Sequence, residues 1–83
     1  MIFKVIAVRD RATDTFGNPF YVSALGQAIR SFSDEINRPA EDNGLNKHPD
    51  DYDLYVLGSY DSESGLFDCS TPRQIAVGKE LVR

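Results

Sequence analysis

The sequence has one cysteine, one histidine and no tryptophan. Because Cys69 has no second cysteine to pair with, an intrachain disulfide and a cysteine-rich metal site are excluded. That composition fits a reducing compartment. His48 stands alone before Pro49, so a histidine metal cluster is excluded, and we interpret its imidazole as a hydrogen-bonded or solvent-exposed turn residue.

A basic excess is also missing. Thirteen acidic residues outnumber nine basic ones, which gives a formal net charge of −4. Residues 1–40 carry five basic and four acidic residues, whereas residues 41–83 carry four basic and nine acidic residues. Proteins that bind nucleic acid mainly by neutralising phosphates carry a visible basic excess. A nucleic-acid contact of this chain therefore requires a local patch or several copies acting together.

No apolar run is long enough to span a membrane. The most apolar stretch, residues 1–8, is far shorter than the roughly 20 residues that a transmembrane helix needs. It also lacks the charged lead and the cleavage site of a signal peptide. We therefore expect a cytoplasmic protein without a membrane partner.

The length of 83 residues predicts a single domain over residues 1–83. A chain of this size buries only about 60–65% of its unfolded surface, so its core is thin. Association with a second copy is a natural supplement to such a core, and we expect a homo-oligomer.

Alternating and β-rich runs predict the strands. Residues 2–8 are apolar on both faces, as in a central or covered strand, with Phe3, Val5 and Ala7 on one face. A polar loop at residues 9–19 precedes a short strand at residues 20–22. A long strand at residues 54–60 is followed by turn-forming residues 61–65, and a last strand is expected near residues 74–77, resuming at residues 81–82.

One amphipathic helix is predicted between Ser23, a candidate N-cap, and about Asn37, with Pro39 as the stop signal. Its apolar stripe repeats at spacings of four, three and four residues. The stripe consists of Leu25, Ile29, Phe32 and Ile36. Residues 38–46 are rich in turn formers and predict a surface connection.

These elements predict an α+β fold, a small antiparallel sheet of four to five strands with one amphipathic helix packed on one face. A single helix leaves the other sheet face uncovered. We expect Ile2, Ile6 and Val8 on that uncovered face, because an exposed apolar sheet face usually marks a partner surface. Self-association through this face or an adjacent strand edge is our hypothesis.

An acidic concentration surrounds the long strand. Carboxylate oxygens are ligands that Ca²⁺ and Mg²⁺ accept, but Gly65 and the missing terminal glutamate depart from the EF-hand pattern. We interpret these carboxylates as turn-capping groups and expect neither a metal nor another cofactor. They are Asp50, Asp51, Asp53, Asp61 and Glu63.

The motifs of an enzyme are missing as well. The sequence contains no glycine-rich phosphate loop, no Ser-His-Asp order and no zinc spacing. No local base stands beside Cys69 to activate it as a nucleophile. We therefore expect no enzymatic activity and no catalytic residue.

Aromatic and basic residues offer a candidate nucleic-acid site. Aromatic side chains on a sheet stack on the bases of single strands, beside basic side chains, at about 1–3 kcal/mol per base. Tyr55 and Tyr60 have opposite parity in the long strand, so without a bulge they point to opposite faces. Core or interface packing is the alternative for most of the aromatics. The candidate residues are Arg9, Arg11, Arg30, Lys47, Tyr21 and Tyr55.

Short motifs follow one another at residues 19–22, 28–34 and 48–61. The last of these contains His-Pro-x-Asp-Tyr-x-Leu-Tyr and then Gly-x-Tyr-Asp, and Gly65 and Phe67 close the hairpin. In these motifs the chain resembles the small nonstructural protein of gokushovirus-type microviruses, phages with single-stranded DNA genomes. The resemblance implies a role in single-stranded genome synthesis or packaging in the host cytoplasm, and it assigns no functional residues.

Two hypotheses follow. The first is a non-enzymatic phage accessory protein that acts in genome synthesis or packaging and binds single-stranded DNA weakly. The second is an adaptor that recruits phage or host replication or capsid proteins without touching DNA. A metal-dependent nuclease is a distant third hypothesis. Loss of affinity with salt and on substitution of Arg9 and Arg11 would favour the first hypothesis over the second.

Overall fold

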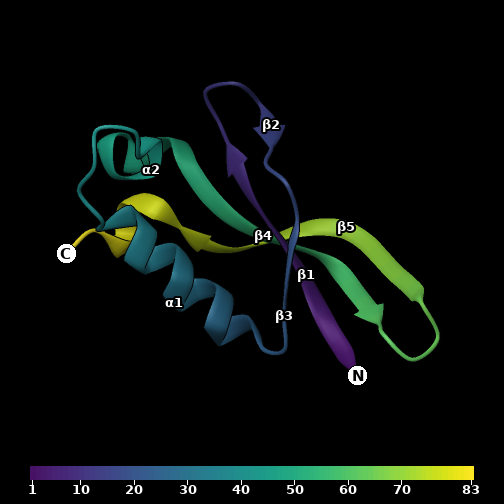
Figure 1. Cartoon of the computed structure of the whole chain (residues 1–83). Helices are drawn as coiled ribbons and strands as arrows, with labels where there is room; N and C mark the ends of the chain where they lie inside the picture. Colours follow the sequence, from purple (N-terminus) through teal and green to yellow (C-terminus); the bar gives the residue numbers. More distant parts are fainter.

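A five-stranded antiparallel sheet with one long helix on one face makes up the computed structural model, which describes residues 1–69 and 71–83 (Figure 1). This architecture confirms the predicted α+β class. The strands are β1 (Ile2–Asp10), β2 (Thr15–Phe16), β3 (Phe20–Val22), β4 (Tyr52–Asp61) and β5 (Leu66–Val77).

The first strand, β1, lies in the middle of the sheet. It pairs with β4 along one edge, and with β3 and then β2 along the other edge. Both of its faces are apolar, as expected for a central strand. The predicted loop at residues 9–19 is shorter than expected, because β1 continues to Asp10 and β2 folds back on it.

The helix α1 (Leu25–Ile36) packs the predicted apolar stripe against the core, with Phe32 and Ile36 buried and Leu25 and Ile29 partly buried. Its N-cap is Ala24 rather than Ser23, so the predicted cap was wrong by one residue. Ser23 still assists the helix start, because its hydroxyl donates to the Gln27 side-chain oxygen at 2.8 Å, and the backbone N–H groups of Ser23 and Ala24 donate to the same oxygen.

The hydrophobic core lies between α1 and the sheet. Its buried members are Ile6, Ala28, Phe32, Ile36 and Leu54. Ile6 and Val8 therefore face the helix, and the prediction that they lie on the uncovered face was wrong. Alternation along β1 showed that the strand has two apolar faces, but only packing decides which of the two the helix covers.

A β-bulge interrupts the pairing of β4. Val5 pairs with Gly58 and Ile6 pairs with Val56, so Leu57 is an extra residue in β4. Gly58 has a φ of +156°, and a Cβ atom there would lie 2.4 Å from the carbonyl oxygen of Asp68 on β5. Only glycine fits this close approach of the two backbones.

The connection after α1 is more ordered than its composition predicts. It contains a short helix, α2 (Gly44–Lys47), and a 3₁₀ turn, η1 (Pro49–Asp51). Asn43 is buried, and its side-chain amide donates to the carbonyl oxygens of Glu35 and Arg38 at 2.8 Å, which closes the C-terminal end of α1.

The C-terminal segment also differs from the prediction. The last strand begins at Leu66 rather than near residue 74, and residues 81–82 do not resume it, because the chain turns into the 3₁₀ helix η2 (Gly78–Leu81). No helix within the described residues is long and apolar enough to cross a membrane.

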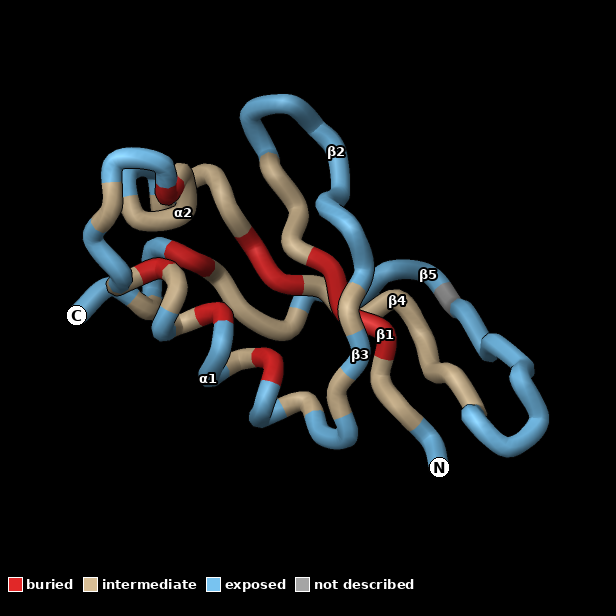
Figure 2. Tube along the Cα trace, viewed as in Figure 1, coloured by how far each residue is buried: buried red, intermediate tan, exposed pale blue. Residues whose placement is uncertain are grey.

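The molecule is elongated, measuring 40 × 23 × 21 Å. Buried residues gather along α1 and the middle of β1 and β4, whereas the β4–β5 hairpin extends away from α1 with an exposed tip (Figure 2).

Candidate nucleic-acid interface

Six aromatic side chains occupy the sheet face opposite α1. Residues paired across antiparallel strands share a face, and the register pairs Phe3 with Tyr60, Tyr60 with Phe67, and Val5 with Tyr21. The same register pairs Ala7 with Tyr55. We call this surface the aromatic face. It comprises Phe3, Phe16, Tyr21, Tyr55, Tyr60 and Phe67.

The bulge in β4 is what places Tyr55 and Tyr60 on one face. A regular strand alternates its side chains, so residues five apart point in opposite directions. The extra residue Leu57 shifts the alternation by one, and both tyrosines then pair with the same face of β1, through Ala7 and Phe3. In a strand without a bulge, Tyr55 and Tyr60 were predicted to point to opposite faces. The bulge is present, so they share one face.

Three rings form the larger cluster on this face. Tyr60 and Phe67 have ring centroids 4.7 Å apart, and Tyr21 lies 5.9 Å from Tyr60 and 6.4 Å from Phe67. Phe3, Tyr21 and Tyr60 line a shallow hollow of about 250 Å³. Tyr21 and Phe67 remain 47% and 54% exposed. The cluster is thus packed on the sheet yet open to solvent.

A second pair of rings lies at the β2 end of the face. Phe16 meets Tyr55 edge to face at a centroid distance of 5.4 Å, which anchors the loop to the sheet while Phe16 stays 43% exposed. The Arg9 guanidinium lies 6.0 Å from the centre of the Phe16 ring. Hydrogen bonds to Asp14 and then Tyr55 raise the pKa of Arg9 above its ordinary value, so this cation is already partnered.

The other predicted arginine of this region, Arg11, follows the end of β1 and is committed to an internal ion pair. The Nε atom of Arg11 lies 3.1 Å from Oδ2 of Asp53, whose side chain is only 4% exposed. The guanidinium also donates to the backbone carbonyl of Asp50. The other carboxylate oxygen of Asp53 has no hydrogen-bond partner among the described residues. The guanidinium of Arg11 therefore stabilises the buried Asp53 carboxylate and is not available as an unpaired cation for a ligand.

The remaining predicted cations lie elsewhere. Arg30 is exposed on α1, which packs on the opposite side of the sheet, and Lys47 is exposed at the end of α2. The structure thus brings together Tyr21, Tyr55 and Arg9 on the aromatic face, pairs Arg11 with Asp53 beyond the end of β1, and separates Arg30 and Lys47 from that face.

Sequence reasoning did not select Phe67, which completes the three-ring cluster, or Phe3, which lines the hollow with Tyr21 and Tyr60. A signal for Phe67 was present, because a hairpin with Asp61 opposite Leu66 places Tyr60 opposite Phe67. No local signal identified Phe3, since its place on the face depends on which side of β1 the helix covers.

The other candidate sites do not assemble into a centre. Asp53 and Asp61 stand at opposite ends of β4, about 26 Å apart along an extended strand. No group of three or more histidine, cysteine or acidic side chains suited to a metal occurs among the described residues. His48 and Cys69 are exposed.

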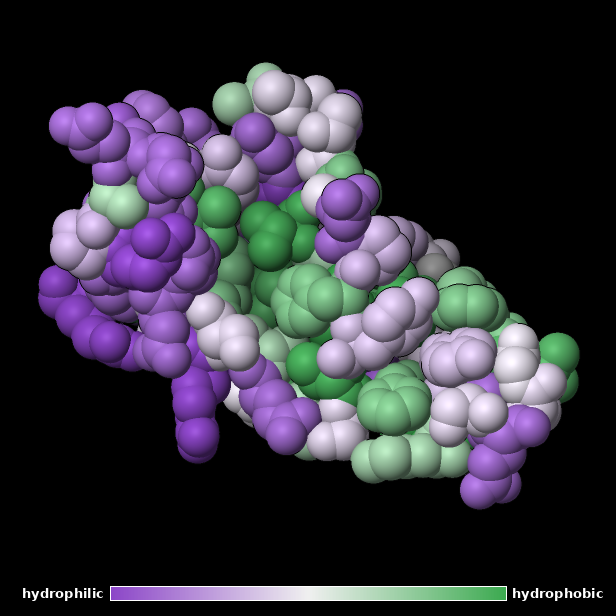
Figure 3. Space-filling view, in the orientation of Figure 1, coloured by the Kyte–Doolittle hydropathy of each residue, from purple (hydrophilic) through white to green (hydrophobic). Residues whose placement is uncertain are grey.

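Hydrophobic and hydrophilic side chains are unevenly distributed over the surface. Figure 3 shows hydrophobic surface over the centre of the sheet and a mixture of hydrophobic and hydrophilic side chains on the β4–β5 hairpin, while the outer surface of α1 and α2 is mostly hydrophilic. Among the described residues, seven large hydrophobic side chains are exposed, and three of them belong to the aromatic face. An exposed apolar patch of this kind on a small chain usually marks a partner surface.

Comparison with protein families gives the chain its identity. A family model described as Phage ORF5 protein matches residues 3–81, from β1 to the end of η2. Comparisons with curated proteins and with solved structures found no match. Because the family model covers nearly the whole sequence, the chain belongs to the phage ORF5 protein family and is a bacteriophage accessory protein.

Proposed function

We propose that this protein is a non-enzymatic accessory factor of a gokushovirus-type microvirus, and that it acts in single-stranded genome synthesis or packaging in the host cytoplasm by binding single-stranded DNA weakly on the aromatic face. The observation that carries the proposal is the cluster of Tyr21, Tyr60 and Phe67 on the sheet, in which Tyr21 and Phe67 are about half exposed. The motifs shared with microvirus nonstructural proteins supply the genome context.

Stacking is the interaction that this surface offers. Each base has an apolar ring face that stacks on an aromatic side chain, at about 1–3 kcal/mol per base. Tyr21 and Phe67 are half exposed and can receive bases, while the less exposed Tyr60 contacts both rings. The duplex buries its ring faces, so this surface favours a single strand.

Electrostatics contributes little to the proposed binding. Arg9 is paired with Asp14, Arg11 is paired with Asp53, and the whole chain carries a net charge of −4. The slope of log affinity against log salt concentration reports how many phosphates a protein neutralises. We expect a slope that corresponds to about one or two phosphates. Micromolar rather than nanomolar affinity follows.

Fluorescence anisotropy of a labelled single-stranded 30-mer, at low and physiological salt, tests the proposal. The double variant Tyr21→Leu with Phe67→Leu keeps the apolar surface but removes two stacking rings. It should weaken binding by at least about 30-fold, since each of the two lost stacks is worth about 1–3 kcal/mol. Tyr21→Phe keeps the ring and should bind like the unmodified protein.

Val82→Ala is the matched control, because Val82 is also half exposed but lies beyond η2, outside the aromatic face. Duplex DNA of the same length should bind less tightly than the single strand. Absence of single-strand binding at low salt, with the protein folded by circular dichroism, would refute the DNA-binding proposal. Cleavage of the strand in the presence of Mg²⁺ would refute the non-enzymatic part.

A second candidate function is supported by the pairing of both arginines. With Arg9 and Arg11 engaged, the aromatic face offers mainly apolar surface, which also suits a second copy or a phage or host replication or capsid protein. In this alternative the protein is an adaptor and a homo-oligomer, and it does not touch DNA.

Oligomeric mass, measured by light scattering, and DNA affinity of the same variants together separate the two candidate functions. If the face binds protein, the double leucine variant should keep its oligomeric mass, since leucine preserves apolar area, whereas Phe67→Glu should reduce it. If the face binds DNA, the leucine variant should lose DNA affinity. A monomeric mass at micromolar concentration would count against self-association.

A further inference from the structure

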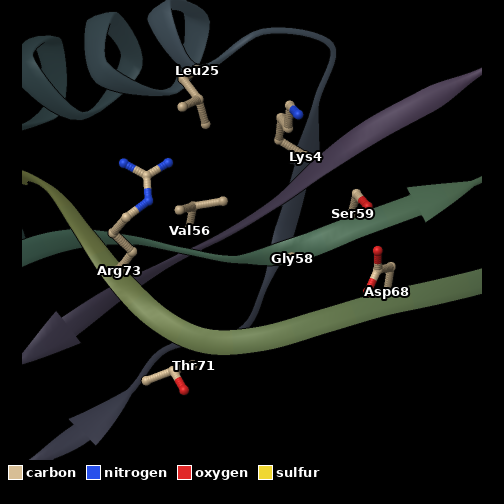
Figure 4. A pocket seen from close by; sticks show the side chains of 8 residues that line it. All are labelled: Lys4, Leu25, Val56, Gly58, Ser59, Asp68, Thr71 and Arg73. Carbon is tan, nitrogen blue, oxygen red and sulfur yellow. The ribbon is translucent and has the colours of Figure 1, made fainter.

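A groove of about 310 Å³ opens on the sheet side that carries α1, away from the aromatic face. Figure 4 shows Lys4 from β1 and Arg73 from β5 on either side of Val56, with Leu25 of α1 above them. Ser59 and Asp68 lie on the Lys4 side of the groove, away from Arg73. The register agrees with this view, because Lys4 pairs with Ser59 and Ser59 pairs with Asp68.

Lys4 and Arg73 form no ion pair among the described residues, although Asp68 lines the same groove. Arg9, Arg11, Arg38 and Arg83 each form an ion pair with an acidic side chain. Over residues 1–69 and 71–83, five basic side chains form no ion pair, and only Lys4 and Arg73 among them line one groove. The others are Arg30, Lys47 and Lys79.

Lys4 is also the polar exception on its side of β1. Ile6 and Val8 on the same face pack into the core, while the Lys4 side chain, on a residue of intermediate exposure, lines the groove. A cation that is not paired with an acidic side chain can attract an anionic ligand. Arg73 adds a planar fork of donors that matches phosphate geometry.

We propose that this groove binds a nucleotide, with its phosphate between Lys4 and Arg73. The apolar side chains of Leu25 and Val56 contact the sugar or base, and Asp68 accepts a hydrogen bond from a base amino group. The site goes beyond the function proposed for the aromatic face and does not depend on it, because the two surfaces lie on opposite sides of the sheet.

The test is a titration of the full chain with 5′-dCMP, followed by amide chemical shifts in two-dimensional NMR. Shifts should concentrate at Lys4, Ser59 and Arg73. Lys4→Gln and Arg73→Gln should each weaken binding about tenfold, the effect of losing one charge-assisted hydrogen bond. Arg30→Gln and Lys79→Gln change the net charge equally and should leave the affinity within about twofold.

Different ligands separate the contribution of the phosphate from that of the base amino group. Deoxycytidine, which lacks the phosphate, should not bind. Thymidine monophosphate lacks an amino group and should bind less tightly than dCMP, and Asp68→Asn should remove this difference. Tighter binding of oligo(dC) than of dCMP, with the same dependence on Lys4 and Arg73, would identify one nucleotide of a strand as the ligand. Equal affinity would identify the free nucleotide.

The double variant Tyr21→Leu with Phe67→Leu should leave dCMP binding unchanged, so failure of the aromatic face and failure of the groove are separable. The proposal is overturned if dCMP shifts no groove residue, or if Arg30→Gln weakens binding as much as Arg73→Gln does.

Discussion

Gly58 of β4 lies against the backbone of Asp68 on β5 so closely that a Cβ atom would come within 2.4 Å of the Asp68 carbonyl oxygen. This contact accompanies the bulge that turns Tyr55 and Tyr60 to the same face of the sheet. The aromatic face therefore depends on a glycine that carries no functional group.

Gly58→Ala should lower the free energy of unfolding by about 1–3 kcal/mol, because alanine at a φ of +156° is strained and its methyl group meets β5. Urea denaturation measures the change. Gly26→Ala is the matched control, since space around Gly26 in α1 is open and alanine favours a helix by up to about 1 kcal/mol. Equal stability of the Gly58→Ala variant and the unmodified protein would contradict this account of the bulge.

Arg11→Ala should cost about 1–3 kcal/mol of stability, because it leaves the buried carboxylate of Asp53 without its partner. Arg9→Ala should cost less than about 1 kcal/mol, because its partner Asp14 is solvent-exposed. Thermal or urea unfolding of both variants checks the difference. Consequently, loss of DNA binding in an Arg11 variant is informative only when its folding has been measured. Similar losses in the two variants would show that Asp53 is adequately solvated without Arg11.

Phe32→Ala should destabilise the protein by about 3–5 kcal/mol, since Phe32 is 3% exposed in the core beneath α1. Phe67→Ala removes the same ring from the aromatic face, where it is half exposed, and should cost less than about 1 kcal/mol. Chemical denaturation of the pair compares a structural phenylalanine with one available to a ligand. A large loss at Phe67 would assign that ring to the stability of the hairpin instead.

Asp61 should contribute to stability at neutral pH and lose that contribution in acid. The backbone N–H of Glu63 donates to its carboxylate at 2.9 Å, and this bond, the largest cause, lowers the pKa of Asp61 below its ordinary value. Because the folded pKa is the lower one, the stabilisation is present above the unfolded pKa and disappears as the pH falls through the folded pKa. Asp61→Asn should therefore be less stable than the unmodified protein at pH 7 and no longer differ from it in strong acid. Urea unfolding across the pH range measures the stability of both proteins. A difference in stability that stays constant with pH would contradict this role.

Much of the fold follows from local patterns. The stripe from Leu25 to Ile36 predicted α1 because a 3.6-residue period requires no knowledge of its partner. The turn formers at residues 61–65 predicted the β4–β5 hairpin for the same reason, since the pairing is between neighbours in sequence. The length of β5 was underestimated, because an edge strand with exposed side chains has little apolar alternation to detect.

The candidate site was less accessible to sequence reasoning. Tyr21, Tyr55 and Arg9 were selected from residue type, and the structure brings them to one face, but Arg30 and Lys47 lie on other surfaces. Residue type shows what a side chain can bind, whereas its neighbours across the sheet are set by register. One bulged residue changes every subsequent side-chain direction in β4.

Residue order alone predicts a small acidic α+β chain, its amphipathic helix, its hairpin and its phage-family motifs. It does not predict that Ile6 and Val8 pack under α1, so that the face of Phe3 stays open to carry the aromatic cluster. Both faces of β1 are apolar, and local periodicity cannot rank two nearly equal hydrophobic surfaces. Packing of the helix against one of them resolves the choice, and it leaves the other face available for a partner.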